Sequence, residues 1–142
     1  MRSIQEGSRS SILNQAITIF ATEPIGLGAP HQYSIRVSLS GRADDAILVN
    51  EVRFQHGPVG KDGSNINGIS DESLIEILVN RLIAFQDGPW ASEANSRALS
   101  HLRGALSAME ERTARRRASG VEGTTQLMPG DRGFDAPRED NL

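Results

Sequence analysis

Two stretches of sequence decide the fold of this chain: SDESLIEILVNRLIAFQ at Ser70–Gln86 and SEANSRALSHLRGALSAMEERTARRR at Ser92–Arg117. In both, apolar residues recur every three or four positions, which is typical of a helix with one apolar face. Only Asp87–Ala91 separates them, and a connection this short makes consecutive helices antiparallel neighbours. The sequence therefore predicts an α-helical hairpin over residues 70–118.

The expected helix ends carry residues that helix termini favour. Ser70 can cap the first helix, and the carboxylate of Asp71 faces the positive end of its dipole. Either Ser92 or Trp90 opens the second helix, and Gly120 ends it by adopting the left-handed conformation after the last turn.

The first helix is apolar over much of its circumference. A stripe of Leu and Phe side chains is widened by β-branched ones: Leu74, Leu78, Leu82, Phe85, Ile75, Val79 and Ile83. A helix of this kind is buried on more than one side. We expect it to pack on the second helix and on either the preceding β segment or a second copy of the chain.

The segment before the hairpin is rich in β-forming residues. Gln32–Leu39 alternates apolar and polar residues, as a half-buried strand does, and Ala46–Gln55 is its simplest antiparallel partner. Such a hairpin needs further packing to be stable. Ser11–Phe20 is compatible with a helix or a strand, and Met1–Ser10 is predicted to be frayed. His56–Ile69 is a long, Gly-rich loop.

These patterns predict an α+β fold, in which a small antiparallel β-hairpin or sheet precedes the antiparallel α-helical hairpin in a homo-oligomer. We divide the chain into a variable N-terminal segment (residues 1–30), a β-rich segment with a long loop (31–69), the helical hairpin (70–118) and a polar C-terminal tail (119–142). The tail is predicted to be extended or disordered.

Composition argues against several classes of protein. The chain has no cysteine, which removes disulfides, thiolate metal sites and Cys nucleophiles. Its three histidines have no metal-ligand spacing, and no base stands beside a nucleophile, so we expect neither a metal nor a cofactor nor enzymatic activity. No apolar run approaches the roughly 20 residues that span a bilayer. We therefore expect a cytosolic protein with no membrane partner.

Positive charge is concentrated in the arginine cluster Arg112–Arg117 at the end of the second helix. Arginine offers a planar fork of donors matched to phosphate. The net charge of the chain is -3, and its acidic excess lies in residues 119–142, which hold two basic and five acidic residues. This favours a small phosphorylated ligand over a nucleic-acid polymer. A nucleic-acid-binding regulatory protein using this cluster, or a merely solvated helix end, stays open.

Other candidate ligand residues lie in the turn and the loop. Phe85 and Trp90 flank the turn, where they either close the hairpin core or stack on a base. Asn95 is either a polar residue at a helix start or a reader of a base edge. Lys61 lies in a Gly-rich loop that can lend its charge to an anion.

The stretch from Asn65 to Thr125 resembles phage proteins that share a helical-hairpin domain. These are the anti-CBASS cyclic-nucleotide sponges and the longer Thoeris anti-defence sponges. The resemblance rests on short motifs: Asn67-Gly68, Val79-Asn80-Arg81-Leu82, Phe85-Gln86-x-Gly88-Pro89-Trp90, Asn95, and Arg112-Thr113 leading to Val121-Glu122-Gly123-Thr124. The β-rich segment before the hairpin makes the chain look like the longer, Thoeris-type member.

The resemblance implies sequestration rather than catalysis. Such proteins bind a nucleotide second messenger of a bacterial immune sensor in the cytoplasm of the infected host. Thoeris-type members bind glycocyclic ADP-ribose, and some bind cyclic di- or trinucleotides. They assemble as dimers that combine into hexamers, with pockets at subunit interfaces.

The resemblance also implies roles for particular residues. Phe85 would line an adenine pocket and Arg112 would grip the pyrophosphate. Further ligand contacts are implied for Trp90, Asn95, Leu99, Lys61 and Arg132. A second site, for a cyclic oligonucleotide, would use Arg116, Arg117, Val121 and Thr124.

Overall fold

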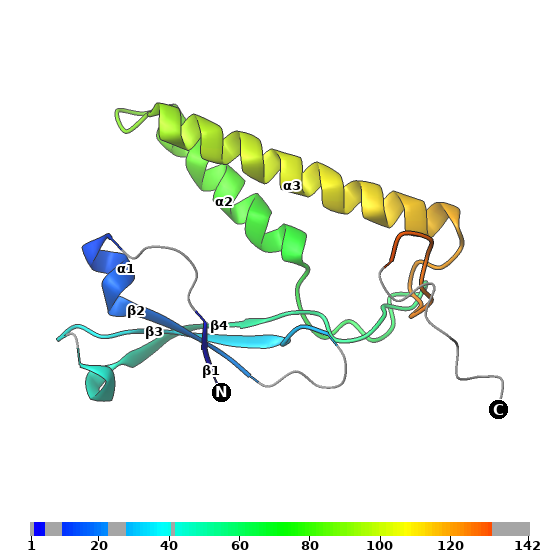
Figure 1. Ribbon diagram of the computed structural model, residues 1–142, viewed down its shortest axis with the longest axis horizontal. Coiled ribbons are helices and arrows are strands. Elements are labelled where there is room, and N and C mark those ends of the chain that lie inside the picture. Colours follow the sequence, from blue (N-terminus) through cyan, green and yellow to red (C-terminus); the bar gives the residue numbers. More distant parts are fainter. Residues whose placement is uncertain (1, 5–9, 23–27, 41, 132–142) are drawn as a thin grey trace. The chain divides into compact units, whose positions relative to one another are not determined.

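The computed structural model describes residues 2–4, 10–22, 28–40 and 42–131 (Figure 1). The chain forms two compact units, one of residues 1–56 with 67–69 and the other of residues 57–66 with 70–142. The first holds a β-sheet and the second holds the helical hairpin, so the predicted α+β fold class is confirmed.

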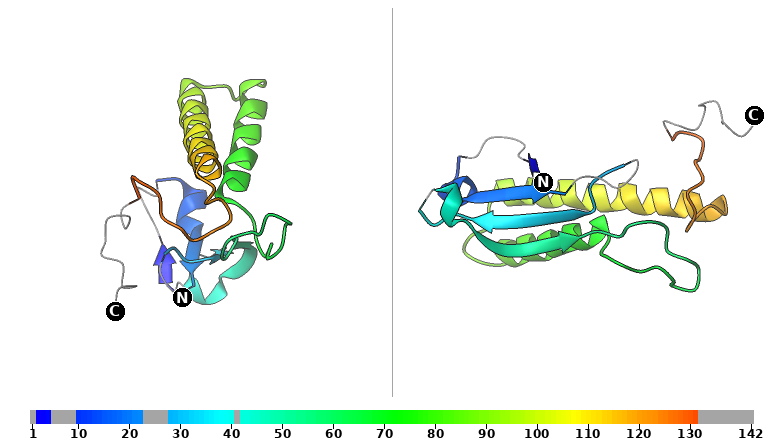
Figure 2. Two further views of the ribbon diagram at one scale, coloured as in Figure 1. Left: turned by 90° about the vertical axis from the view of Figure 1, so that its right-hand side faces the viewer. Right: turned by 90° about the horizontal axis from the view of Figure 1, so that it is seen from below.

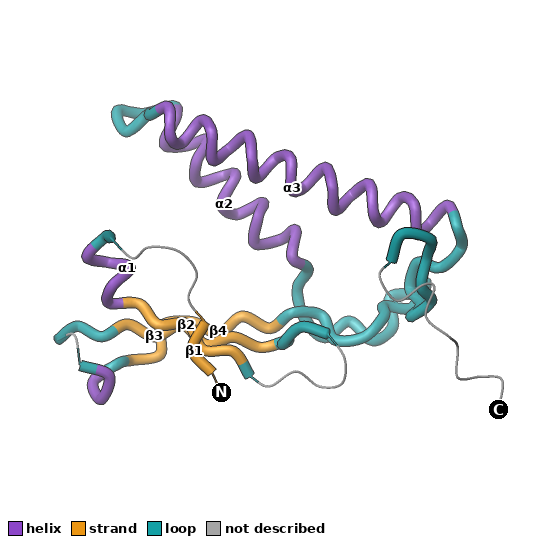
Figure 3. Tube along the Cα trace, viewed as in Figure 1, coloured by secondary structure: helices purple, strands orange, loops and turns teal. Residues whose placement is uncertain are grey.

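The first unit is built on a four-stranded antiparallel sheet, drawn in orange in Figure 3. Its strands are β1 (Arg2–Ile4), β2 (Ile17–Ala21), β3 (Gln32–Val37) and β4 (Ile47–Arg53), and they lie side by side in chain order. The antiparallel pairing of β3 with β4 confirms the predicted β-hairpin. The sheet as a whole adds β2, from a stretch that the sequence left open between helix and strand, and β1, from a stretch that was predicted to be frayed.

The N-terminal part of the sheet corrects one expectation and settles another. Residues 2–4 are not frayed, because they pair with β2 and place Ile4 opposite Ile19. The ambiguous stretch is helical first and extended afterwards. Ser11 caps α1 (Ile12–Ala16) by accepting a hydrogen bond from the Asn14 amide, and the β-branched residues that follow favour β2.

The sheet buries little of its apolar surface within this chain. Among the described residues of this unit, Ala21 and Ser34 are the fully buried ones. Three apolar residues of the edge strand β4 are half exposed or more: Ile47, Leu48 and Val49. After β4 the chain makes a loop and returns to the sheet, where Ile69 forms a parallel bridge with Phe54.

The second unit contains two antiparallel helices, α2 (Asp71–Gln86) and α3 (Glu93–Ala118), which lie side by side in both views of Figure 2. Ser70 and Ser92 are the N-caps, so Ser92 rather than Trp90 opens the second helix. Gly120 follows the last turn with a φ of 71°, as expected of a left-handed residue that ends a helix. The predicted helix boundaries are correct to within one residue.

The helical hairpin has an apolar interior that is only half covered. No residue of either helix is fully buried. The half-buried apolar residues are Leu74, Ile75, Val79 and Leu82 of α2 and Leu99, Leu102, Ala105, Leu106 and Met109 of α3. The predicted packing of the two helices on each other is present, and Ile77 and Leu78 of α2 remain largely exposed.

Candidate functional site

One end of the helical hairpin is its turn, where the predicted aromatic residues lie in solvent. The side chain of Trp90 is 74% exposed and that of Phe85 is 39% exposed. The Arg81 guanidinium lies 5.6 Å from the centre of the Phe85 ring. The interpretation that both rings close a core is wrong for this chain, and both are available to a ligand or a second copy.

Asn95 forms hydrogen bonds that stabilise this turn. Its backbone amide donates to the Ser92 hydroxyl at 3.0 Å, and its side-chain amide donates to the Trp90 carbonyl at 3.2 Å. Asn95 therefore holds Trp90 in place through its main chain. Leu99 lies one helical turn later and is half-buried.

The other end of α3 forms a pocket with the tail. The cavity measures about 260 Å³ and is lined by Arg112, Arg115, Arg116, Met128, Pro129, Gly130 and Asp131. The predicted arginine cluster therefore lines a cavity whose other side is formed by the tail. Arg115 also donates a hydrogen bond to the Pro129 carbonyl at 3.3 Å. No hydrogen bond or ion pair ties Arg112 to another residue in the described ranges, so the donors of its guanidinium remain available to a ligand in the cavity.

Arg116 organises the tail. Its Nη2 atom donates to three backbone carbonyls, those of Val121 at 3.2 Å, Thr124 at 3.1 Å and Gln126 at 3.1 Å. Its Nη1 atom lies 3.9 Å from a carboxylate oxygen of Asp131. This guanidinium, which the resemblance placed in a second ligand site, therefore fixes the course of the chain after α3.

The tail is ordered around this guanidinium. Val121 and Met128 are buried, and the Thr124 hydroxyl donates to the Val121 carbonyl at 2.6 Å. The prediction of an extended or disordered tail is therefore wrong for residues 119–131, because one charged side chain satisfies carbonyls from three of its positions. Arg132 lies outside the described residues.

Arg117 is paired with the tail through Glu122, at a distance of 2.8 Å. The hydrogen bond from Arg117 lowers the pKa of the Glu122 carboxyl, and the charges of Arg117 and Lys61 act in the same direction. The same pairing raises the pKa of Arg117. Lys61 itself is an exposed residue of the loop.

The structure does not bring all the predicted site residues together in one chain. Phe85, Trp90, Asn95 and Leu99 lie at or near the turn, whereas Arg112, Arg116, Arg117, Val121 and Thr124 lie at or beyond the far end of α3. Asn95 and Arg112 are 17 positions apart, which corresponds to about 25 Å of helix at 1.5 Å per residue. The chain therefore carries two separate groups of candidate residues.

Sequence reasoning missed the tail side of the arginine pocket. Met128 and Asp131 line it because the chain turns back after α3. The amide of Met128 donates a hydrogen bond to the Asp131 carboxylate at 2.8 Å, which holds this turn. No local sequence pattern predicts that the chain turns back at this point. Arg115 belonged to the noted cluster, but its place in the pocket required the structure.

Comparison with known proteins bears directly on this hairpin. Residues 47–114 match the family described as the Acb2/Tad1 hairpin domain. The chain carries an Acb2/Tad1 hairpin domain. The resemblance inferred from the short motifs is thereby confirmed.

A curated relative supports the same assignment. The chain is 41% identical over 73 residues to the protein named Thoeris anti-defense 1 of Bacillus phage SBSphiJ7. The aligned part covers 51% of this chain and 50% of that protein. The chain is thus matched over about half the length of the curated relative.

The bounds of the Acb2/Tad1 hairpin match are informative about the site. The match begins at Ile47, the first residue of β4, so it includes this strand and the loop as well as α2 and most of α3. It ends at Ala114, after Arg112 and before the remaining arginines and the tail. No helix among the described residues is long and apolar enough to cross a membrane.

Proposed function

We propose that this protein is a phage anti-defence sponge that binds a cyclic nucleotide second messenger and releases it unchanged. The observation that carries the proposal is the match of residues 47–114 to the Acb2/Tad1 hairpin domain, supported by the phage relative named for Thoeris anti-defence. The expected ligands are glycocyclic ADP-ribose and cyclic di- or trinucleotides. The protein would act in the cytoplasm of the infected bacterium.

The arginine pocket supplies the phosphate-binding half of this proposal. Arg112 is unpaired among the described residues and lies beside Arg115 in the same cavity, so two guanidinium groups face one space. Bidentate contacts from Arg to phosphate are among the strongest hydrogen bonds that proteins make. Asp131 also lines the cavity, where its carboxylate lies 3.9 Å from the Arg116 guanidinium, so a bound diphosphate would compete with this carboxylate for the positive charge of the pocket.

The turn of the hairpin supplies the base-binding half. Phe85 and Trp90 present aromatic surface to solvent, and stacking on such surface contributes about 1–3 kcal/mol per base. Leu99 extends this apolar surface along α3. The bond from Asn95 to the Trp90 backbone keeps the turn rigid, which lowers the ordering cost of binding.

A second copy of the chain is required to unite the two halves. The base and the diphosphate of one nucleotide are much closer together than the roughly 25 Å that separates Asn95 from Arg112 along the helix. An antiparallel neighbour would bring its Arg112 next to the Phe85 of the first chain. The exposed apolar residues of α2, Ile77 and Leu78, would be covered in such a dimer, and dimers would combine into a hexamer.

A capture experiment tests the proposal. The purified protein is incubated with glycocyclic ADP-ribose, the unbound fraction is removed by ultrafiltration, and the retained fraction is heated and examined by mass spectrometry. We expect the messenger to disappear from the filtrate and to return intact after heating. Recovery of a cleavage product would show that the protein is an enzyme, and a full filtrate would contradict sequestration.

Arg112→Ala is the decisive variant, with Arg103→Ala as its matched control. Both arginines are exposed on α3, but only Arg112 lines the pocket. We expect Arg112→Ala to abolish capture and Arg103→Ala to retain it, with both variants assembling as the wild type does in size-exclusion chromatography. Capture by Arg112→Ala would show that the phosphate is held elsewhere.

A further inference from the structure

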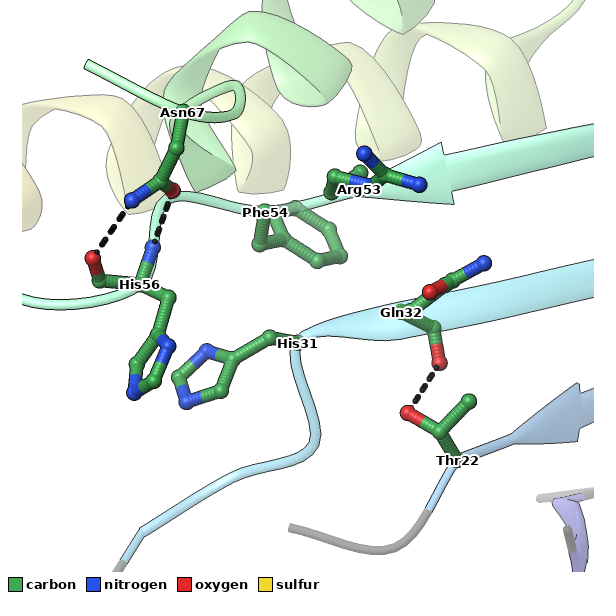
Figure 4. A pocket seen from close by; sticks show the side chains of 7 residues that line it. All are labelled: Thr22, His31, Gln32, Arg53, Phe54, His56 and Asn67. Atoms are coloured by element: carbon green, nitrogen blue, oxygen red, sulfur yellow. Dashed lines mark hydrogen bonds between the residues drawn. The ribbon is translucent and has the colours of Figure 1, made fainter. Parts of the chain in front are cut away.

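The sheet unit contains a cavity that takes no part in the proposed sponge site (Figure 4). It measures about 240 Å³ and is lined by Thr22, His31, Gln32, Arg53, Phe54, His56 and Asn67. These residues come from the ends of β2, β3 and β4 and from the loop that follows. No carboxylate is among the lining residues that the structure describes, whereas two imidazoles and one guanidinium are.

The two imidazoles are stacked on each other. The ring centres of His31 and His56 are 4.4 Å apart, and the ring planes meet at 27°. Figure 4 shows the two rings next to each other, with His31 coming from just before β3 and His56 from the loop after β4. Within the described part of the chain neither imidazole forms a hydrogen bond, so the ring N–H groups of both are available to a ligand.

The backbone holds both histidines firmly. The side chain of Asn67 accepts a hydrogen bond from the His56 amide at 2.8 Å and donates one to the His56 carbonyl at 2.8 Å. The amide of Phe54 donates to the His31 carbonyl at 2.7 Å. The cavity is therefore formed before any ligand arrives, which reduces the entropy lost on binding.

Gly68 makes this arrangement possible. A Cβ atom at this position would lie 2.4 Å from the carbonyl carbon of Phe54, so no other residue fits here without displacing the chain. The close passage places Asn67 against His56. The Asn67-Gly68 motif thus has a structural role in building the cavity.

We propose that this cavity is a binding site for a small phosphate-bearing anion. Two imidazole N–H groups side by side can donate to two oxygens of one phosphate, and protonation of either ring strengthens the contact. Arg53, which pairs with Gln32 across the sheet, adds a positive charge at the rim. A metal is a poorer occupant, because stacked rings direct their lone pairs alongside one another rather than toward one point.

The proposal does not depend on the sponge function, because none of its residues belongs to the helical hairpin unit. The chain has three histidines, and the third, His101, is an exposed residue of α3. Its resonances are a built-in control for any experiment that observes imidazole groups. Pyrophosphate is a suitable probe, because it carries the proposed chemistry without a base or a sugar.

The test is a titration of the full chain with pyrophosphate, observed through the imidazole C–H resonances in ¹H–¹³C spectra. We expect the signals of His31 and His56 to shift together with one dissociation constant, while the His101 signal stays in place. Unmoved His31 and His56 signals would overturn the proposal. Equal shifts of all three histidines would also overturn it, because they would reveal unspecific binding.

Two variants assign the binding to the ring N–H groups. His31→Phe and His56→Phe keep an aromatic ring but remove the donors, so each should weaken pyrophosphate binding about tenfold or more. His101→Phe should bind as the wild type does. In Arg112→Ala, which alters a separate pocket in the other unit, the His31 and His56 signals should still shift with the same dissociation constant. Loss of the His31 and His56 shifts in Arg112→Ala would place the anion in the arginine pocket instead, and would overturn the assignment.

Discussion

The side-chain amide of Gln86, the last residue of α2, bonds both main-chain groups of Ser92, the N-cap of α3. Its Nε2 atom donates to the Ser92 carbonyl at 3.0 Å, and its Oε1 atom accepts from the Ser92 amide at 2.9 Å. A single residue thus joins the end of one helix to the beginning of the next. The geometry of the turn that presents Phe85 and Trp90 depends on this pair of hydrogen bonds.

We predict that Gln86→Ala lowers the free energy of unfolding by about 1–2 kcal/mol, because it leaves two backbone groups without their partner. Chemical denaturation followed by circular dichroism measures the change. Glu76→Ala, an exposed site on the same helix, is the control and should change stability little. Equal stability of the two variants would show that water replaces the Gln86 amide without cost.

Arg116→Met should release the tail while leaving the hairpin folded. The substitution keeps the apolar stem but removes the donors to the carbonyls of Val121, Thr124 and Gln126. Faster amide hydrogen exchange in residues 121–131, with unchanged exchange in α2, is the expected result. Arg103→Met, at an exposed position of the same helix, is expected to leave the tail protected. A protected tail in Arg116→Met would contradict the anchoring role.

The Arg117–Glu122 ion pair should make stability depend on pH. Because the pairing lowers the native pKa of Glu122, the pair stabilises the fold above the ordinary value of 4.5. That contribution is lost as pH falls through the lowered native pKa. The melting temperatures of the wild type and Glu122→Gln should therefore differ near neutral pH and converge in acid. The difference should be small and should shrink in high salt, since both groups are exposed. A constant difference at all pH values would argue against the ion pair.

Two glycines should respond to alanine in opposite directions. Gly68→Ala forces a Cβ against the backbone of Phe54 and should lower stability by about 1–3 kcal/mol. Gly104 lies inside α3 with no atom within 4 Å of an added Cβ, so Gly104→Ala should raise stability by about 1 kcal/mol. Thermal unfolding at low protein concentration measures both. A loss of stability in Gly104→Ala would show that a second copy contacts this face of α3.

Mixed assemblies test whether the sponge site is shared between copies. Phe85→Ala and Arg112→Ala should each fail to capture glycocyclic ADP-ribose. When the two variants are unfolded together and refolded, one mixed site should combine an intact Phe85 with an intact Arg112, and part of the capture should return. No recovery in verified mixed assemblies would place both residues in separate sites. Mixing Arg112→Ala with itself is the control.

The helical hairpin was predictable because its determinants are local. Periodicity of apolar residues, the caps Ser70 and Ser92 and the terminating Gly120 each act within one or two turns of helix. The pairing of β3 with β4 followed from alternation and proximity in the chain. Strand β1 was not predictable, because three residues of polar and apolar character become a strand only where Ile19 and its neighbours offer an edge.

The candidate site divides in the same way. The arginine cluster and the aromatic residues were visible as types in the sequence. Their assignment to opposite ends of the hairpin, and the use of Arg116 to hold the tail, required the structure. The stacking of His31 on His56 was also invisible, since these residues are 25 positions apart and meet through the register of β3 with β4.

The sequence by itself determined the α+β class, the helix boundaries and the residue types that suit a phosphorylated ligand. These features depend on backbone preferences and side-chain chemistry of residues that are close together in the chain. Only the tertiary structure decided which donors remain free. Arg112 lines a cavity and forms no hydrogen bond among the described residues. Arg116 instead donates to the backbone carbonyls of a chain segment that folds back onto α3. That difference arises from long-range packing, which fixes the partners of each polar group and so separates the residues that build the site from those that can bind.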